Sequence, residues 1–460
     1  MTLALQSSSL AKMAMFDIDQ HTGFMAPGPP PDRLPQYWED WEVLLEIAVK
    51  SKLQVGDKLG LSEEERAISQ RWRESVRAVR YQWNINYITF PILNVGPQLP
   101  TLSVAGLLNS IVLLRRSHLV LAYILHFYVQ TIPLTDLVSI PPSITLPLLR
   151  ISKKLDIPPV LTYADTVLYN WNFKTKPKSR DIVPELNNIC SQTTFTTFID
   201  EEEFYLCSAR IELRGVEILE MMRVTMDETF IGDAIAVRRI TEHLNTISIA
   251  LCDLKSLLLS VKNLCDPDVY YNEVRPWLRG EDSFDTHTQR KWIFEGVDDD
   301  TELRPPTELS GPSAGQSSII HVFDIFLGVD HQATSPGRPS FMSRMQKYMP
   351  KNHRSFLDHL KSNPRPLRTF VMDRNDKALS MAFNRSVLAL KEFRDAHMII
   401  AALYILGPAR RAAKRRLEVA EVDGNVTSTP CHRPLKGTGG TDLVKFLKDT
   451  RSRTKETLVD

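Results

Sequence analysis

The sequence has little cysteine, and none of it is arranged for a metal site or a disulfide framework. The five cysteines among 460 residues are odd in number, and no two of them form a CxxC pair. These absences argue against a zinc ribbon and a disulfide-stabilised secreted fold. A reducing, cytoplasmic compartment is the expected location.

The sequence also lacks an excess of charge of either sign and a long uninterrupted apolar run. Lys and Arg total 56 against 55 Asp and Glu, a formal net charge of +1, which gives no global field for nucleic acid or an anionic membrane. The most apolar internal run, at 119–129, contains His126 and is too short to cross a bilayer. We therefore expect no nucleic-acid partner and no membrane. The basic run at 410–416 has no interleaved aromatic residues and favours a solvated face.

Several common catalytic motifs are missing. No GxxxxGK[ST] motif occurs, and His353 and His359 do not form HExxH, so nucleotide-binding and metalloprotease functions have no support. The letters GPSAG at 311–315 match GxSxG, with Ser313 as the nucleophile. That motif requires a buried strand before it, and the acidic, proline-containing run at 298–309 does not predict one. A serine hydrolase is therefore disfavoured.

Helical periodicity dominates what is present. A chain of 460 residues exceeds what one hydrophobic core usually fills, and no series of alternating runs predicts a sheet. We predict an all-α, two-domain helical protein. Its parts are a flexible N-terminal extension at 1–33, a smaller helical domain at 34–173, an interdomain connection at 174–187, and a larger helical domain at 188–460 that includes a mobile loop at 407–441.

The longest helices are expected in the larger domain, at 200–226, 232–265 and 375–406. Five prolines in 141–159 favour irregular chain packed over helices there. Gly407-Pro408 is expected to end the last long helix. We expect a monomer, because no coiled-coil repeat or exposed apolar seam is evident.

One histidine lies deep inside the apolar helical pattern at 388–406. Steps of three and four residues put Leu390, Phe393 and His397 on one stripe with Ile400, so the imidazole is expected to face the interior. A buried imidazole needs a partner for each nitrogen, which can be a metal or haem iron, or an ordinary hydrogen bond. Periodicity alone leaves both possibilities open, and it favours a core histidine whose ring nitrogens form ordinary hydrogen bonds.

Four motifs resemble the indoleamine 2,3-dioxygenase family, in the same order and at similar separations. They are PPVLTYAD at 158–165, SGPSAGQSS at 310–318, FRDAH at 393–397 and GTGGTD at 437–442. The resemblance covers about 35–455. It implies that His397 is the proximal ligand of one b-type haem, held in the larger domain, ferrous in the active state and kept reduced by an electron donor.

The resemblance also implies roles for other side chains. Arg275 would bind a substrate carboxylate, while Arg394, Asp324 and Ser313 would contact the haem. The substrate pocket would be formed by Tyr163, Phe204, Ser208, Tyr270, Arg275, Ser313, Ala314, Gly315, Ile320 and Thr438. No side chain is implied to act as acid or base. Without the resemblance, Phe204 and Ser208 are ordinary core packing and Asp324 with Arg394 is an ordinary salt bridge.

The implied reaction inserts O2 across the C2–C3 bond of the indole of L-tryptophan to give N-formylkynurenine, the first step of the kynurenine pathway towards NAD. Tyr270 stands where the family usually has phenylalanine, and Pro312 stands where it usually has a second glycine. These departures leave two alternatives open, an oxygen-binding haem protein without turnover and a dioxygenase for a modified indole. The retained Arg275 disfavours oxygen storage, which has no use for a carboxylate clamp.

Overall fold

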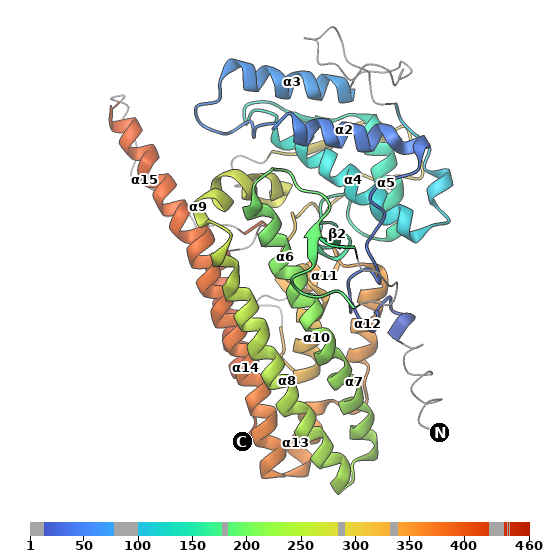
Figure 1. The fold of residues 1–460 in the computed structure, drawn as a ribbon, viewed down its shortest axis with the longest axis vertical. Coiled ribbons are helices and arrows are strands. Elements are labelled where there is room, and N and C mark those ends of the chain that lie inside the picture. Colours follow the sequence, from blue (N-terminus) through green and yellow to red (C-terminus); the bar gives the residue numbers. More distant parts are fainter. Residues whose placement is uncertain are drawn as a thin grey trace.

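The structure, a computed structural model, consists mostly of helices, as predicted (Figure 1). It describes residues 13–77, 100–176, 183–283, 290–331, 339–422, 437–438, 440 and 442–460. Residues 177–182 of the predicted interdomain connection lie outside these ranges, as do residues 423–436, 439 and 441 of the predicted mobile loop. The described chain also contains four short strands that the sequence did not predict. β1 (Val138–Ile140) pairs in parallel with β4 (Trp292–Phe294), and β2 (Trp171–Phe173) pairs antiparallel with β3 (Ile189–Ser191).

The upper part of the molecule in Figure 1 contains α2 (Glu39–Lys50), α3 (Glu63–Arg77), α4 (Ile111–Gln130) and α5 (Pro142–Leu155). Among the described residues, two helical segments, Ile111–Gln130 and Ala234–Asn263, are long and apolar enough to cross a membrane by length and composition alone. In the most apolar stretch of α4, 78% is buried inside the protein, so this helix belongs to the core.

Helix α5 corrects the prediction of irregular chain at 141–159. Pro142 is the first residue of the helix, where a missing N–H removes no intrahelical hydrogen bond. Pro147 lies inside the helix, and Ile144 and Leu148 on either side of it are fully buried. Burial of this apolar face therefore outweighs the cost of the internal proline.

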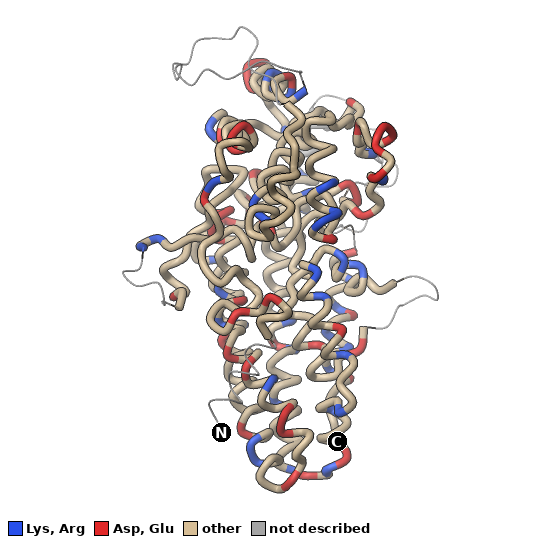
Figure 2. The backbone as a smooth tube through the Cα atoms, turned by 90° about the vertical axis from the view of Figure 1, so that its right-hand side faces the viewer, with Lys and Arg blue, Asp and Glu red and all other residues tan. Residues whose placement is uncertain are grey.

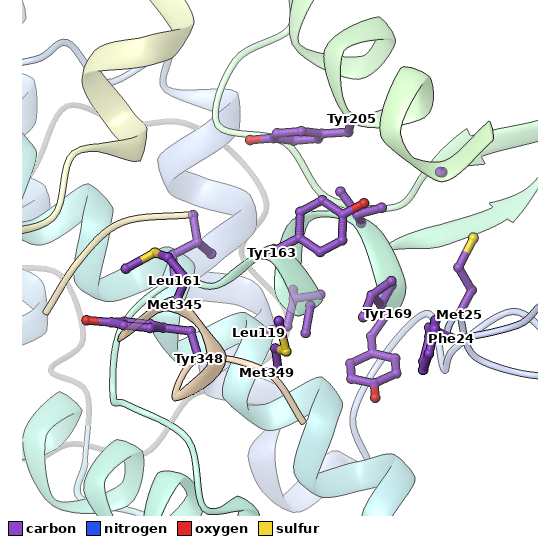
Figure 3. Close-up of a cluster of buried hydrophobic side chains, with 14 of the residues drawn as sticks. Phe24, Met25, Leu119, Leu161, Tyr163, Tyr169, Tyr205, Met345, Tyr348 and Met349 are labelled. Carbon is purple, nitrogen blue, oxygen red and sulfur yellow. The ribbon is translucent and has the colours of Figure 1, made fainter. Parts of the chain in front are cut away.

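The N-terminal segment is not a flexible extension over the part that the structure describes. Ile18, Phe24 and Met25 are buried, and Phe24 contacts the His353 ring edge-on at a centroid distance of 4.8 Å. Asp17 forms an ion pair with Arg115. Figure 3 shows Phe24 and Met25 in the same buried cluster as Tyr163 and Tyr169. Ile18, Phe24 and Met25 therefore anchor this segment to the core.

The lower part of the molecule is a bundle of long helices. The middle and lower parts of the molecule together contain α6 (Ile199–Arg214), α7 (Val216–Ile231), α8 (Ala234–Ser260), α10 (Ser318–Leu327), α11 (Phe341–Gln346), α12 (Lys351–Lys361), α13 (Leu367–Arg374), α14 (Lys377–Ala401) and α16 (Leu443–Lys455). The predicted helix at 200–226 is divided at Gly215, which lies between α6 and α7 and packs against Ile319 of α10. A Cβ on Gly215 would lie 2.0 Å from Cδ1 of Ile319.

Gly407-Pro408 does not end the helical chain as predicted. A π-helical turn, η10 (Ala402–Leu406), follows α14, and α15 (Gly407–Val422) continues from it. Pro408 lies in the first turn of α15, where its missing N–H is tolerated. Residues 407–422 of the predicted mobile loop are therefore helix, and α15 extends away from the body (Figure 1). Basic and acidic residues are interspersed along the chain in the view of Figure 2.

Candidate functional site

His397 lies on α14, which is joined to α8 by a hydrogen bond from the Ser386 hydroxyl to the Leu244 carbonyl, 2.8 Å long. The imidazole is partly buried, and neither ring nitrogen has a hydrogen-bond partner among the described residues. Burial, together with the positive charge of Arg394, lowers the pKa of His397 to about 4. At neutral pH the ring is therefore uncharged, the state that a metal ligand requires.

Arg394, one turn before His397, forms a buried ion pair with Asp324 of α10. The other Asp324 oxygen accepts a hydrogen bond from Nε2 of His331 at 2.7 Å, and the Arg394 guanidinium also donates to Thr454. Burial alone would raise the pKa of Asp324, but Arg394 and His331 outweigh it and lower the pKa below its usual value. A fixed cation is thus held one turn from His397.

The sequence predicted the pairing of Arg394 with Asp324 but not the two residues that support it. His331 lies just beyond the end of α10, and Thr454 lies near the end of α16. No recognisable motif contains either residue. Their roles arise because α10, α14 and α16 lie together in the bundle.

Three aromatic rings link the predicted pocket residues to the helix that carries His397. The Phe204 and Tyr270 rings have centroids 4.2 Å apart, and Tyr270 meets Tyr404 edge-on at 5.7 Å. Tyr404 lies two turns after His397, in η10, and its hydroxyl donates to the Cys265 carbonyl at 2.6 Å. Phe204 and Tyr270, which are 66 positions apart in the chain, are therefore brought into direct contact.

The Tyr270 hydroxyl differs from those of the neighbouring buried tyrosines. It forms no hydrogen bond with a described residue, whereas the Tyr163 and Tyr404 hydroxyls both donate to protein oxygens. Burial raises the pKa of Tyr270, so the phenol remains protonated at neutral pH. This phenol is the departure from the family pattern noted in the sequence, and it contributes a donor to a largely apolar region.

Arg275 begins the short helix η6 (Arg275–Leu278), directly after the π-helical turn η5 (Tyr270–Val274) that carries Tyr270. Its guanidinium carbon lies 5.5 Å from the centroid of the Tyr271 ring. Burial lowers the pKa of Arg275, yet an arginine remains charged at neutral pH. The local fold therefore places a cation beside the aromatic residues.

The glycine-containing loop at 310–316 lies directly against the Arg275 segment. A Cβ on Gly311 would be 2.0 Å from the Leu278 carbonyl oxygen, and one on Gly280 would be 2.4 Å from the Gly311 nitrogen. Only glycine permits this approach of two backbones. The amide of Gln316 accepts from the Tyr163 backbone at 2.8 Å and donates to the Gly311 carbonyl at 2.9 Å.

Thr438 packs against this loop from a distant part of the chain. Its hydroxyl donates to the Pro312 carbonyl at 2.7 Å, and its carbonyl accepts from the Gly311 amide at 3.1 Å and the Ser283 hydroxyl at 2.8 Å. Two of the four family-like motifs are therefore in direct contact. Pro312 lacks a donor, as the sequence indicated, but its carbonyl is used as an acceptor.

The remaining predicted loop and pocket residues are placed as follows. The Ser313 hydroxyl accepts from the Gly315 amide at 3.2 Å, so it closes a turn, and the Gly315 carbonyl bonds the His321 ring at 2.8 Å. Ala314 is exposed, whereas Ser208 and Ile320 are partly buried.

No strand precedes Gly311 within 290–310 other than β4, which ends at Phe294. The strand that a serine-hydrolase elbow requires is therefore missing there.

Tyr163 is tied to a residue that sequence reasoning missed. Its hydroxyl donates to Oε1 of Glu212 at 2.9 Å, and the Ser317 hydroxyl donates to the same oxygen at 2.7 Å. Burial raises the pKa of Glu212 to about 7. A signal was available, because Phe204, Ser208 and Glu212 follow one another at four-residue steps on α6 and therefore share a face.

Comparison with known proteins agrees with these features. A family model described as indoleamine 2,3-dioxygenase matches residues 12–457. Indoleamine 2,3-dioxygenase 1 of Mus musculus is 31% identical over 363 residues, covering 79% of this chain and 84% of the relative. Indoleamine 2,3-dioxygenase of Saccharomyces cerevisiae is 30% identical over 369 residues, covering 75% and 78%. Indoleamine 2,3-dioxygenase acdA of Aspergillus candidus is 32% identical over 328 residues, covering 69% and 74%. The chain is thus a dioxygenase enzyme that belongs to the indoleamine 2,3-dioxygenase family.

Proposed function

We propose that the protein is a haem-dependent dioxygenase that inserts both atoms of O2 across the C2–C3 bond of the indole of L-tryptophan, giving N-formylkynurenine. The observation that carries the proposal is the series of ring contacts from Phe204 through Tyr270 to Tyr404. These contacts connect the segment that carries Arg275 with the helix that carries His397. An aromatic amino acid is the substrate class that such a combination of rings and guanidinium suits.

The residues fit the haem that the family implies. His397 has a neutral ring, and no described residue competes for its nitrogens. Arg394 supplies a buried positive charge one turn away, which suits an anionic propionate, and Asp324 holds it in place. In this proposal His397 would hold the haem iron. The haem would supply the binding and activation of O2, which no amino-acid side chain can provide.

The side chains bind and orient the substrate. Arg275 pairs with the carboxylate through its two-pronged guanidinium, while Phe204 and Tyr270 contact the indole. Burial raises the pKa of Tyr163 and of Tyr270, so neither phenol serves as a base at neutral pH. The contact of Thr438 with Pro312 closes the loop edge and helps to exclude water.

The test is a turnover assay with the haem-loaded protein, a reductant, air and L-tryptophan, followed by the absorbance of N-formylkynurenine. We expect product when the iron is reduced and none when the same preparation is kept oxidised. A stable oxygen complex that gives no product with L-tryptophan would contradict the proposal. That outcome would favour an oxygen-binding protein if other indoles also gave no product.

A modified indole is a second candidate substrate, and the Tyr270 hydroxyl favours it, because this donor on a largely buried residue forms no hydrogen bond with a described residue. A substrate with a hydroxyl or carbonyl group on the indole could accept its hydrogen bond. The test is direct competition between L-tryptophan and such indoles, in the wild type and in Tyr270→Phe. A wild-type preference for the polar indole that disappears in the variant supports the second candidate, and equal preference in both proteins excludes it.

A further inference from the structure

We propose that Glu212 is a positioning residue for the substrate pocket, and that the protonation state of its carboxyl group sets how firmly the Tyr163 wall of the pocket is held. The inference rests on the proposed function, in which Tyr163 lines the site. It adds a residue from outside the predicted pocket and a pH dependence of substrate binding.

Glu212 connects three separate segments of the chain. It lies on α6, Tyr163 directly precedes the π-helical turn η3 (Ala164–Leu168), and Ser317 is the residue before α10. Both hydroxyls donate to the single oxygen Oε1 of Glu212, at 2.9 Å and 2.7 Å. Glu212 is 1% exposed, so water does not compete freely for these bonds. The position of the Tyr163 ring therefore depends directly on this carboxyl group.

The second oxygen of Glu212, Oε2, is buried and has no hydrogen-bond partner among the described residues. Glu201, three turns earlier on the same helix, is a useful contrast. Its Oε1 accepts from the Phe195 amide and the Tyr205 hydroxyl, and its Oε2 accepts from the amide and hydroxyl of Thr196. Both carboxylate oxygens of Glu201 therefore accept hydrogen bonds, as expected of a structural residue, whereas only one oxygen of Glu212 does.

The charge on Glu212 is sensitive to pH in the physiological range. Burial raises its pKa from 4.5 to about 7, and the hydrogen bonds from Ser317 and Tyr163 offset only part of that effect. The groups that face the carboxyl are these two hydroxyls, and no charged side chain of the described chain contributes to the shift. When neutral, the carboxyl can carry its proton on Oε2, where no other donor competes.

The two protonation states hold Tyr163 with different strength. An ionised Glu212 accepts charge-assisted hydrogen bonds, which are roughly twice as strong as neutral ones. Below the pKa the network persists with weaker bonds, and the Tyr163 ring gains freedom. We expect the KM for L-tryptophan to fall about fivefold as the pH rises through 7, the factor that corresponds to strengthening one hydrogen bond from neutral to charge-assisted. Because Tyr163 contacts the substrate throughout the reaction, kcat should change little.

The experiment compares the pH dependence of KM and kcat in the wild type, Glu212→Gln and Tyr163→Phe. Glutamine retains an oxygen that accepts from both hydroxyls but carries no charge. The fivefold change of KM near pH 7, the step in KM, should therefore disappear. Tyr163→Phe removes the connection to the pocket and should also abolish the step. Tyr205→Phe is the matched control, because it removes a phenol that is bonded to Glu201, a different buried glutamate of α6. The control should retain the step.

Calorimetric binding of L-tryptophan at pH 6 and pH 8 provides a readout that needs no turnover, and it should show the same fivefold change. A step that persists in Glu212→Gln, or one that disappears in Tyr205→Phe, would overturn the inference and leave the proposed function intact. Absence of a step in the wild type would overturn it as well. A wild type that neither binds nor oxidises L-tryptophan at any pH overturns both proposals. If Glu212→Gln does not fold, Tyr163→Phe decides the outcome.

Discussion

Replacing Glu212 by glutamine should change how the stability of the protein depends on pH. In the folded chain the Glu212 pKa is about 7, against an ordinary value of 4.5. The folded state therefore binds the proton more tightly than the unfolded state, and the free energy of unfolding falls as the pH rises from about 4.5 to 7. Between pH 5 and pH 8 this single group lowers the free energy of unfolding by about 2.5 kcal/mol. Glutamine does not titrate, so the variant lacks this loss.

Thermal unfolding of both proteins at pH 5, 6, 7 and 8 measures the effect. With an unfolding entropy of roughly 2.1 cal/mol/K per residue over the chain, the predicted change corresponds to about 2–3 °C. The Tm of the variant minus that of the wild type should rise by this amount from pH 5 to pH 8. Glu64→Gln, which replaces an exposed glutamate of α3, should give a constant difference. A constant difference for Glu212→Gln as well would refute the reasoning.

Three further substitutions test other parts of the site. His397→Ala should give folded protein that does not retain haem, measured as the haem-to-protein absorbance ratio after gel filtration, and full occupancy would exclude His397 as the ligand. Arg275→Ala should retain haem but lose kcat/KM for L-tryptophan by roughly 10-fold or more, whereas unchanged kinetics would place the carboxylate elsewhere. Gly311→Ala should lower stability by about 1–3 kcal/mol, because its Cβ would lie 2.0 Å from the Leu278 carbonyl oxygen. Gly28→Ala, where no atom lies within 4 Å of the added Cβ, is the control, and equal melting temperatures would argue against the close contact.

The positions of the long helices could be predicted because their apolar residues recur with helical spacing over many turns. The helix around His397 is one example, since Leu390, Phe393 and Ile400 are all buried on its stripe. The errors occur where packing opposes a local signal. The apolar face of α5 is buried despite Pro147, and α6 is separated from α7 at Gly215, where Ile319 of α10 packs against the chain.

The candidate site could be predicted only in part. The family resemblance pointed to Arg275, His397 and the glycine loop as candidates, and the helical spacing at 388–406 predicted that His397 turns inward. The sequence indicated nothing of the contact between Thr438 and Pro312, since the two residues are 126 positions apart. It also predicted a mobile loop from 407 onward, where α15 continues to Val422.

By itself the sequence determined the helical class, the face of each long helix that turns inward, and the resemblance that points to haem chemistry. These properties depend on neighbours within a few turns, which fix the direction of a side chain relative to its own helix axis. Only the tertiary structure decided which side chains meet. Tyr163 and Ser317 reach Glu212 from 49 and 105 positions away, and their convergence buries the carboxyl group that raises its pKa to about 7. Burial and partnership are properties of packed elements, so no local pattern of residues could have specified them.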